Sequence, residues 1–245
     1  MVQVDGIQWY RRQAFGEDYL NLYRHRGVDE AAAVADLIRR RTSARQGGFA
    51  LDVGCGFGRH LRFLGNHNWT VGVDLSASLL RVARQTQRQA PLVLADMREL
   101  PFPAAAFDLV VNLFTSFGYF HDDANNLKVI SEVSRVTAKH GWFVLDFLNA
   151  AQVRRTLVDF DRYRMGGYTI EQRREISQDG HYVQKNVTFV GPGRTYSERV
   201  RLFDAGELIC MFNHCGFEVR AVLGDYQGNP FNTDSPRAIV FGQRS

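Results

Sequence analysis

The residue types best suited to chemistry lie in the glycine-rich segment LDVGCGFGR at residues 51–59. A short apolar run precedes the glycines, which predicts a buried strand that runs into a tight turn and then into a helix over residues 58–65. Glycine adopts positive φ angles at little cost and lets a ligand approach the main chain closely. The first turn of the following helix offers free amides to negatively charged groups. The segment therefore predicts a loop that cradles a ligand, and a tight turn without a ligand is the alternative.

Two carboxylates stand at the ends of the next two predicted strands. Asp74 ends the second strand, twenty residues after Gly54, where a carboxylate can accept hydrogen bonds from ribose hydroxyls. This position suits a nicotinamide dinucleotide and S-adenosylmethionine equally, but the glycines read G-x-G-x-G and not the G-x-G-x-x-G of a dinucleotide-binding loop. Asp96 follows the third strand, where it can accept a hydrogen bond from an adenine amino group. Each acid alone could be a helix cap or a turn former, but together with the glycine loop they favour binding.

An aromatic-rich segment, LFTSFGYFH at residues 113–121, follows the fourth predicted strand. In an open α/β sheet, ligands bind beyond the carboxyl ends of the strands. Aromatic faces at this place could exclude water and attract a positively charged sulfonium centre. Phe114 and Phe117 are expected to pack in the core, whereas Tyr119 and His121 are equally compatible with packing and with function.

Strands and helices alternate through the first part of the chain, which argues for a parallel sheet with helices on both faces. The predicted strands cover residues 49–53, 69–73, 91–95, 107–113 and 142–146. The predicted helices cover residues 31–45, 58–65, 76–88 and, with Asp122 or Asp123 as cap, the segment up to Lys139.

The alternation stops after Asn149. Glycine-containing turns separate three extended runs at residues 168–176, 182–190 and 195–202, which predicts an inserted antiparallel sheet of three strands. A helix at 207–215 and strands at 217–223 and 237–243 complete the chain. The predicted fold class is therefore α/β, a Rossmann-like doubly wound sheet, mostly parallel with an antiparallel last strand, plus a small inserted antiparallel β-sheet.

The order of five segments, LDVGCGFGRH, VGVDLS, ADMRELPF, FDLVVNLFTSFGYF and GWFVLDFLN, resembles that of class I S-adenosylmethionine-dependent methyltransferases. The resemblance extends from about Phe49 to Gln243. Within this class, the chain is similar to small-molecule enzymes with a β-sheet insertion after the fifth strand, and S-adenosyl-L-methionine is the implied cofactor. The implied cofactor residues are Asp52, Gly54, Cys55, Gly56 and Gly58 in and before the loop, Asp74 and Leu75 at the ribose and adenine, Asp96 and Met97 at the adenine, and Asn112, Phe114 and Thr115 at the methionine part.

The pattern and the resemblance together predict three parts of the chain. These are an N-terminal helical lid at 1–45, a cofactor-binding methyltransferase domain at 46–150 and 204–245, and an inserted sheet at 151–203 over the acceptor site. Methyl transfer requires an aligned acceptor and exclusion of water, with a base where the acceptor is an amine or a hydroxyl. We predict His121 as this base with Tyr119 as its orienting partner. Tyr10 and Tyr19 are predicted substrate contacts from the lid, for which a docked amphipathic helix is the alternative.

Composition narrows the function classes. The 245 residues carry a net charge of +4, and the arginines are spread along the chain, so nucleic acid is not expected as a partner. Three cysteines make no disulfide framework, no apolar stretch approaches a membrane span, and no metal-ligand spacing is present. We therefore predict a cytoplasmic enzyme that methylates N or O of a small-molecule acceptor, with a homodimer as a possible assembly. RNA or protein is the alternative acceptor, and a nicotinamide-dependent oxidoreductase or a non-catalytic nucleotide binder is less favoured.

Overall fold

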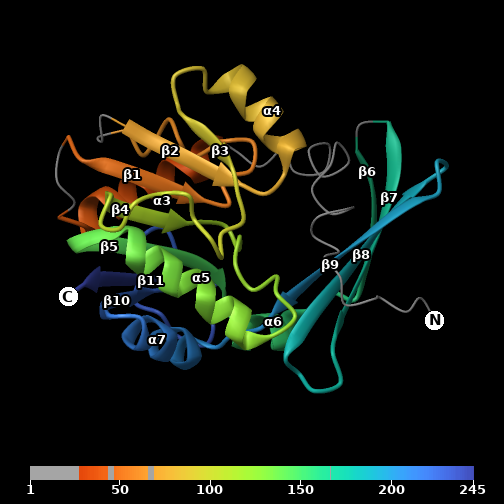
Figure 1. The fold of residues 1–245 in the computed structure, drawn as a ribbon. Helices are drawn as coiled ribbons and strands as arrows, with labels where there is room; N and C mark the ends of the chain where they lie inside the picture. The colour runs from red at the N-terminus through yellow and green to blue at the C-terminus, as the bar shows by residue number, and fades with distance from the viewer. Residues whose placement is uncertain (1–27, 44–46, 66–68, 166) are drawn as a thin grey trace.

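The computed structural model describes residues 28–43, 47–65, 69–165 and 167–245, whose strands form two sheets (Figure 1). The larger sheet has seven strands in the order β10-β11-β5-β4-β1-β2-β3. Neighbours are parallel from β3 to β5, and β11 is antiparallel to both β5 and β10. This confirms the predicted Rossmann-like fold. The strands are β1 Phe49–Val53, β2 Trp69–Asp74, β3 Leu92–Leu94, β4 Phe107–Asn112, β5 Thr137–Leu148, β10 Phe217–Leu223 and β11 Arg237–Arg244.

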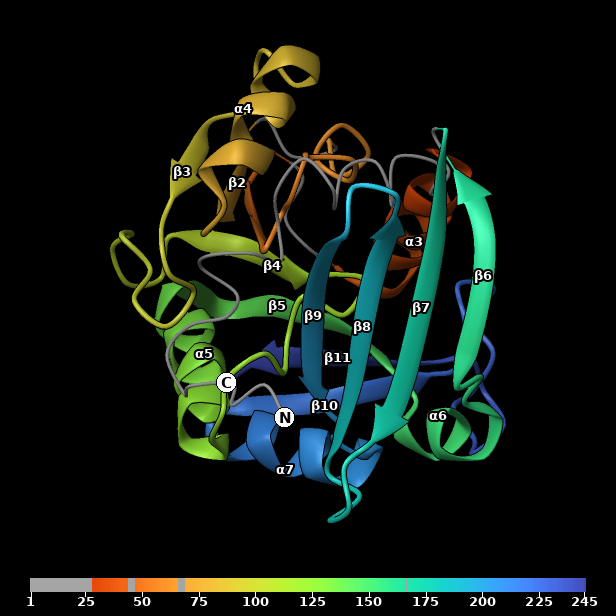
Figure 2. The ribbon, with the colours of Figure 1, turned by 90° about the vertical axis from the view of Figure 1, so that its right-hand side faces the viewer.

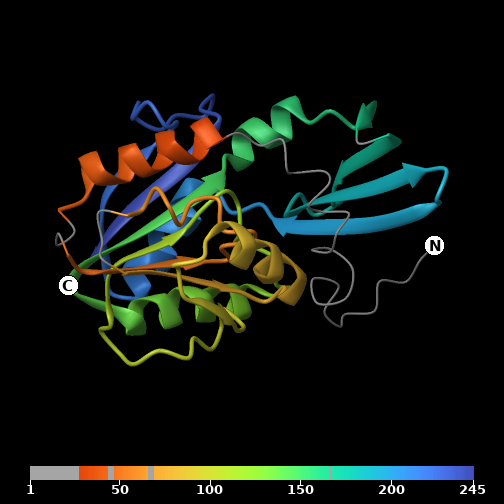
Figure 3. The same cartoon turned by 90° about the horizontal axis from the view of Figure 1, so that it is seen from above.

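Helices cover both faces of the large sheet, with α3 (Val28–Arg41) on one face and α5 (Asp123–Val136) on the other (Figure 3). Leu37 and Ile38 of α3 belong to a buried cluster with Trp142 of β5. Ile130 of α5 belongs to a second cluster, which also contains Phe212 of α7 (Ala205–His214). Within the described ranges, no helix has both the length and the apolar character that crossing a membrane requires.

The helix α4 (Ala77–Thr86) starts where the sequence predicts it. The amide of Leu79 donates to the hydroxyl of Ser76 at 3.2 Å, so Ser76 is the N-cap. The N-cap thus lies two residues after Asp74, the last residue of β2.

One predicted helix is absent, and another ends earlier than predicted. Residues 58–65 form successive turns and not a regular helix, because Gly58 adopts a φ of +79° and the amides of Gly58 and Leu61 bond three residues back. The helix α5 ends at Val136 and not at Lys139. Thr137 instead starts β5 and pairs with Phe107, and a register irregularity in β4 follows.

The inserted sheet has four antiparallel strands and not three (Figure 2). They are β6 Phe160–Met165, β7 Tyr168–Ile176, β8 Tyr182–Val190 and β9 Arg194–Arg201, and a short helix α6 Ala150–Thr156 precedes them. The buried guanidinium of Arg201 ties β9 to the main domain, since it pairs with Asp123 at 3.2 Å and with Glu207 at 2.8 Å. The arrowheads of β2 and β4 point toward this inserted sheet (Figure 1), which therefore lies on the side where ligands of α/β sheets bind.

Candidate functional site

The glycine loop after β1 is held closely against its neighbours. The amides of Gly54 and Cys55 both donate to the carbonyl of Val73, at 2.8 and 3.0 Å. Gly54 has a φ of +75°, and a Cβ added to it would lie 2.7 Å from the Cβ of Ser116. Any larger residue would therefore both strain the backbone and collide with the turn after β4.

Asp74 closes the loop from the end of β2. One carboxylate oxygen accepts from the amide of Gly56 at 2.8 Å, and the other accepts from the amide of Ser76 at 2.7 Å. Burial raises the pKa of Asp74, although these backbone hydrogen bonds oppose the rise. Each oxygen keeps acceptor capacity beyond one bond, so the carboxylate can organise the loop and still receive donors from a ligand.

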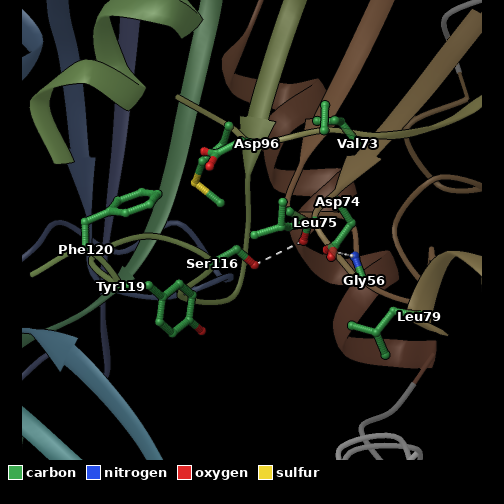
Figure 4. A pocket seen from close by; sticks show the side chains of 12 residues that line it. Gly56, Val73, Asp74, Leu75, Leu79, Asp96, Ser116, Tyr119 and Phe120 are labelled. Carbon is green, nitrogen blue, oxygen red and sulfur yellow. Dashed lines mark hydrogen bonds between the residues drawn. The ribbon is translucent and has the colours of Figure 1, made fainter. Parts of the chain in front are cut away.

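A pocket of about 660 Å³, part of it open to solvent, lies between this loop and the turn after β4. Asp74 and Leu75 lie on one side of it, and Tyr119 and Phe120 lie on the other (Figure 4). Asp96 lies in the segment after β3, and its carboxylate accepts a hydrogen bond of 2.7 Å from Nη2 of Arg98. The lining residues are Gly54, Gly56, Val73, Asp74, Leu75, Leu79, Ala95, Asp96, Met97, Ser116, Tyr119 and Phe120.

This pocket brings together six of the residues predicted for cofactor binding, namely Gly54, Gly56, Asp74, Leu75, Asp96 and Met97. Three others shape the loop from behind. Gly58 lies against Ala83 of α4, and Cys55 is buried with its sulfur against Gly72. The side-chain amide of Asn112 donates to the backbone carbonyls of Val53 and Ser116.

Asp52 and His60 are buried next to each other. They line neither this pocket nor the pocket on the side of the inserted sheet. Oδ2 of Asp52 lies 3.9 Å from Nδ1 of His60. Burial, followed by the charge of Asp74, raises the pKa of Asp52 to about 7, and Arg59 opposes this. Burial, followed by the charge of Arg59, lowers the pKa of His60 to about 3. The pair therefore resists placing a charge on either group.

A second pocket of about 760 Å³, also partly open, lies between the turn after β4 and the inserted sheet. Phe114 and Thr115, which were predicted to face the methionine part of the cofactor, line this second pocket instead of the first. Tyr119 lines both pockets and so stands at their junction. The full lining is Phe114, Thr115, Tyr119, Leu148, Arg174, Val183, Lys185, Glu198, Val200 and Arg237.

The other predicted site residues are less central. The side chain of His121 is exposed and lines neither of these pockets, while its carbonyl accepts a hydrogen bond of 2.7 Å from the hydroxyl of Tyr182 on β8. Tyr10 and Tyr19, together with most of the predicted lid, lie outside the described residues. Within the described part of the chain, no group of three or more histidine, cysteine or acidic residues could hold a metal ion.

Sequence reasoning missed several residues of the two pockets. Ser116 lies inside the aromatic-rich segment and could have been found there, because ligands lie beyond the end of β4. Lys185, Glu198 and Arg237 carry no local signal, since each belongs to a different strand and only the fold brings them together.

Comparisons with known proteins agree with this geometry. Residues 51–145 match a family model described as methyltransferase domain. Over 241 residues, the chain is 29% identical to a dTDP-3-amino-3,6-dideoxy-alpha-D-glucopyranose N,N-dimethyltransferase of Streptomyces fradiae, covering 92% of this chain and 88% of that protein.

Two solved structures extend the similarity to the whole fold. An S-adenosylmethionine-dependent methyltransferase of Clostridium acetobutylicum superposes with a TM-score of 0.81 at 18% identity. The superposition covers 94% of this chain and 97% of that one. An amino pentose methyltransferase of Micromonospora echinaspora, solved with S-adenosylmethionine bound, gives a TM-score of 0.69 at 25% identity, covering 96% and 99%.

The glycine loop, the pocket beyond β1 and β2 and these matches define the class I methyltransferase fold. Residues 51–145 match the methyltransferase domain family, and over most of its length the chain is similar to S-adenosylmethionine-dependent methyltransferases. The nicotinamide-dependent alternative is accordingly not supported.

Proposed function

We propose that the chain transfers a methyl group from S-adenosylmethionine, held in the first pocket, to N or O of a small molecule held in the second. The observation that carries this proposal is the position of Tyr119, which lines both pockets at their junction. Two ligands that meet at one side chain can be aligned for direct transfer, and alignment is the main requirement of the reaction.

The hydrogen-bond acceptors of the first pocket suit the proposed cofactor. Asp74 would accept from the ribose hydroxyls, and Asp96 would accept from the adenine amino group. Leu75, Leu79 and Met97 supply apolar surface to the same pocket. The cofactor supplies an activated methyl group, and this chain binds, orients and shields it.

A polar acceptor suits the second pocket. Lys185 and Glu198 face each other across neighbouring strands of the insert at 2.6 Å, and both side chains are less than one-fifth exposed. Arg174 and Arg237 supply further donors along the wall. Since similar proteins are named as amino-sugar methyltransferases, we propose an amino sugar or a comparable polar metabolite as the acceptor.

The proton of an amine or hydroxyl acceptor must leave as the new bond forms. We retain His121 as the proposed base with Tyr119 as its orienting partner, and Tyr10 and Tyr19 as proposed contacts from a lid over the site. Tyr119 is the better placed of the first two, because it lines both pockets whereas His121 is exposed. Comparing Tyr119→Phe with His121→Asn in the same assay separates their roles.

The test has two parts. Calorimetry should show binding of S-adenosylmethionine and S-adenosylhomocysteine and no binding of NAD. The protein should then transfer a methyl group to dTDP-3-amino-3,6-dideoxyglucose or to another polar small molecule in a mass-spectrometric screen that includes RNA and a protein mixture. Methylation of RNA or protein alone would overturn the proposal. A homodimer and a cytoplasmic location also stay predictions, and the particle mass in solution tests the first.

A further inference from the structure

The turn that separates the two pockets has an unusual backbone. Phe114 and Thr115 are consecutive, and their φ angles are +58° and +62°. Residues other than glycine rarely adopt the left-handed region, and a β-branched residue such as threonine is especially unfavourable there. Two such residues in a row persist only where the surrounding structure holds them, and such sites cluster where function needs a fixed geometry.

Asp146, at the carboxyl end of β5, holds both residues of this turn. Its buried carboxylate accepts from the amide of Phe114 at 3.0 Å, and its carbonyl accepts from the amide of Thr115 at 2.9 Å. Arg237 of β11 completes the contact. Its Nε donates to Asp146 at 2.7 Å, and its Nη2 donates to the hydroxyl of Thr115 at 3.0 Å.

Asp146 and Arg237 form a hydrogen-bonded ion pair in which the carboxylate is buried. Burial is the largest single influence and lowers the pKa of Arg237, but the charges of Asp146 and Tyr226 and the hydrogen bond to Asp146 together raise this pKa above its ordinary value. The hydroxyl of Tyr226 gives the same carboxylate another donor at 2.7 Å. A hydrogen-bonded ion pair of this kind is costly to bury and is retained in some proteins because it specifies one conformation.

On its other side, the turn is joined to the glycine loop. The hydroxyl of Ser116 donates to the carbonyls of Leu113 and Gly54, at 2.9 and 3.2 Å. Asn112 donates to the carbonyl of Ser116 at 3.2 Å. A shift at Phe114 and Thr115 would therefore move Ser116 in the first pocket and Tyr119 at the junction together.

We propose that Asp146 and Arg237 are positioning residues, which act as a clamp that keeps Phe114 and Thr115 in the left-handed conformation and so fixes Tyr119 between the two pockets. The clamp concerns the conformation of the chain itself. Only the assignment of the second pocket to the acceptor rests on the proposed function.

Fluorine NMR of the full chain, with 3-fluorotyrosine incorporated at position 119, tests the clamp without any ligand. The parent should give one sharp resonance. Asp146→Asn and Arg237→Lys should each lose this sharp resonance, through broadening or a second resonance. Phe114 and Arg237 donate to different oxygens of Asp146, of which asparagine keeps only one. Lysine lacks the planar guanidinium fork, which reaches Asp146 and Thr115 from two separate nitrogens. Tyr226→Phe is the matched control, because it removes a donor to Asp146 that makes no hydrogen bond to Phe114 or Thr115, and it should keep the single resonance.

A second substitution tests the role of the backbone. Asparagine tolerates the left-handed region better than threonine, so Thr115→Asn should restore a single resonance when combined with Arg237→Lys. A single unshifted resonance in both Asp146→Asn and Arg237→Lys would overturn the clamp, and if Asp146→Asn fails to fold, Arg237→Lys alone decides. Failure of Thr115→Asn to restore the resonance would overturn the part played by the left-handed backbone. None of these outcomes depends on which acceptor, if any, is methylated.

Discussion

The two pockets that meet at Tyr119 are built in different ways. Most of the first comes from one continuous stretch, residues 54–97, in which each strand end delivers its side chain in sequence order. The second takes its walls from the turn after β4, from three strands of the insert and from β11, which lie far apart in the chain. The first pocket therefore depends on local backbone geometry, whereas the second depends on how separate elements dock.

The largest loss of stability and of cofactor binding is expected from adding a side chain at Gly54 in the glycine loop of the first pocket. Gly54→Ala adds a Cβ within 2.7 Å of Ser116 at a φ of +75°. The sum of backbone strain and overpacking should destabilise the fold by roughly 2–4 kcal/mol and should abolish binding of S-adenosylhomocysteine in calorimetry. Gly206→Ala, in the first turn of α7, is the matched control and should bind normally. Normal binding by Gly54→Ala would mean that the loop can rearrange around the added group.

A smaller loss is expected from the carboxylate at the end of β2. Asp74→Asn should weaken S-adenosylhomocysteine binding by about 2 kcal/mol, because ribose hydroxyls would lose a charged acceptor. Asparagine keeps one acceptor oxygen, which can serve the amide of Gly56 or that of Ser76 but not both, so the loop should loosen while most of the fold survives. Asp108→Asn is the control, since Asp108 bonds the amide of Phe49 and lines neither pocket. Equal affinities for the two variants would reduce Asp74 to a structural role.

The second pocket should respond in acceptor kinetics and not in cofactor affinity. Glu198→Gln breaks the ion pair with Lys185 in the wall of that pocket. We expect the KM for the acceptor found by the methyl-transfer screen to rise about tenfold, equivalent to about 1.4 kcal/mol, with Kd for S-adenosylhomocysteine unchanged. Glu218→Gln breaks an exposed pair with Arg220 on β10 and should change neither constant. A changed Kd with an unchanged KM would reverse the assignment of the two pockets.

The same contrast explains what the sequence could predict. The glycine loop, the Ser76 cap and the carboxylates Asp74 and Asp96 follow from local patterns. The structure confirms the cap, and it places Gly54, Gly56 and both carboxylates in the lining of one pocket. Local patterns failed where tertiary pairing decides. Ala138 and Lys139 favour a helix by propensity, but the pairing of Thr137 with Phe107 draws this segment into β5.

The inserted sheet shows a weaker signal of the same kind. The strand β6, residues Phe160–Met165, alternates exposed and half-buried positions, but its sequence alternates polar and apolar residues only from Arg162 onward, because Phe160 is exposed and Asp161 is half-buried. The contact between Asp146 and Arg237 had no such signal. It joins residues 91 positions apart, and only the antiparallel docking of β11 on β5 places them together.

The smallest net effect on stability is expected from the buried pair of Asp52 and His60, because the raised pKa of one and the lowered pKa of the other make stability depend on pH in opposite directions. With a pKa of about 7 instead of 3.8, folded Asp52 keeps a proton that the unfolded chain has released, so this residue makes stability fall as pH rises from about 4 to 7. With a pKa of about 3 instead of 6.5, folded His60 has lost a proton that the unfolded chain keeps, so this residue makes stability rise from about pH 3 to 6.5. Between about pH 4 and 6.5 both states hold one proton on the pair, which therefore contributes no slope.

Removing one residue of the pair should reveal how the other alone makes the free energy of unfolding depend on pH. In Asp52→Asn only His60 still titrates, so the free energy of unfolding relative to the parent should rise across this window by about 1.4 kcal/mol per pH unit. In His60→Gln only Asp52 remains, and the same difference should fall with a similar slope. Urea unfolding at several pH values measures both differences, and Asp108→Asn should run parallel to the parent because Asp108 is not part of the pair. A curve for Asp52→Asn that also runs parallel to the parent would contradict the lowered pKa of His60, and it would mean that this histidine carries its charge inside the fold.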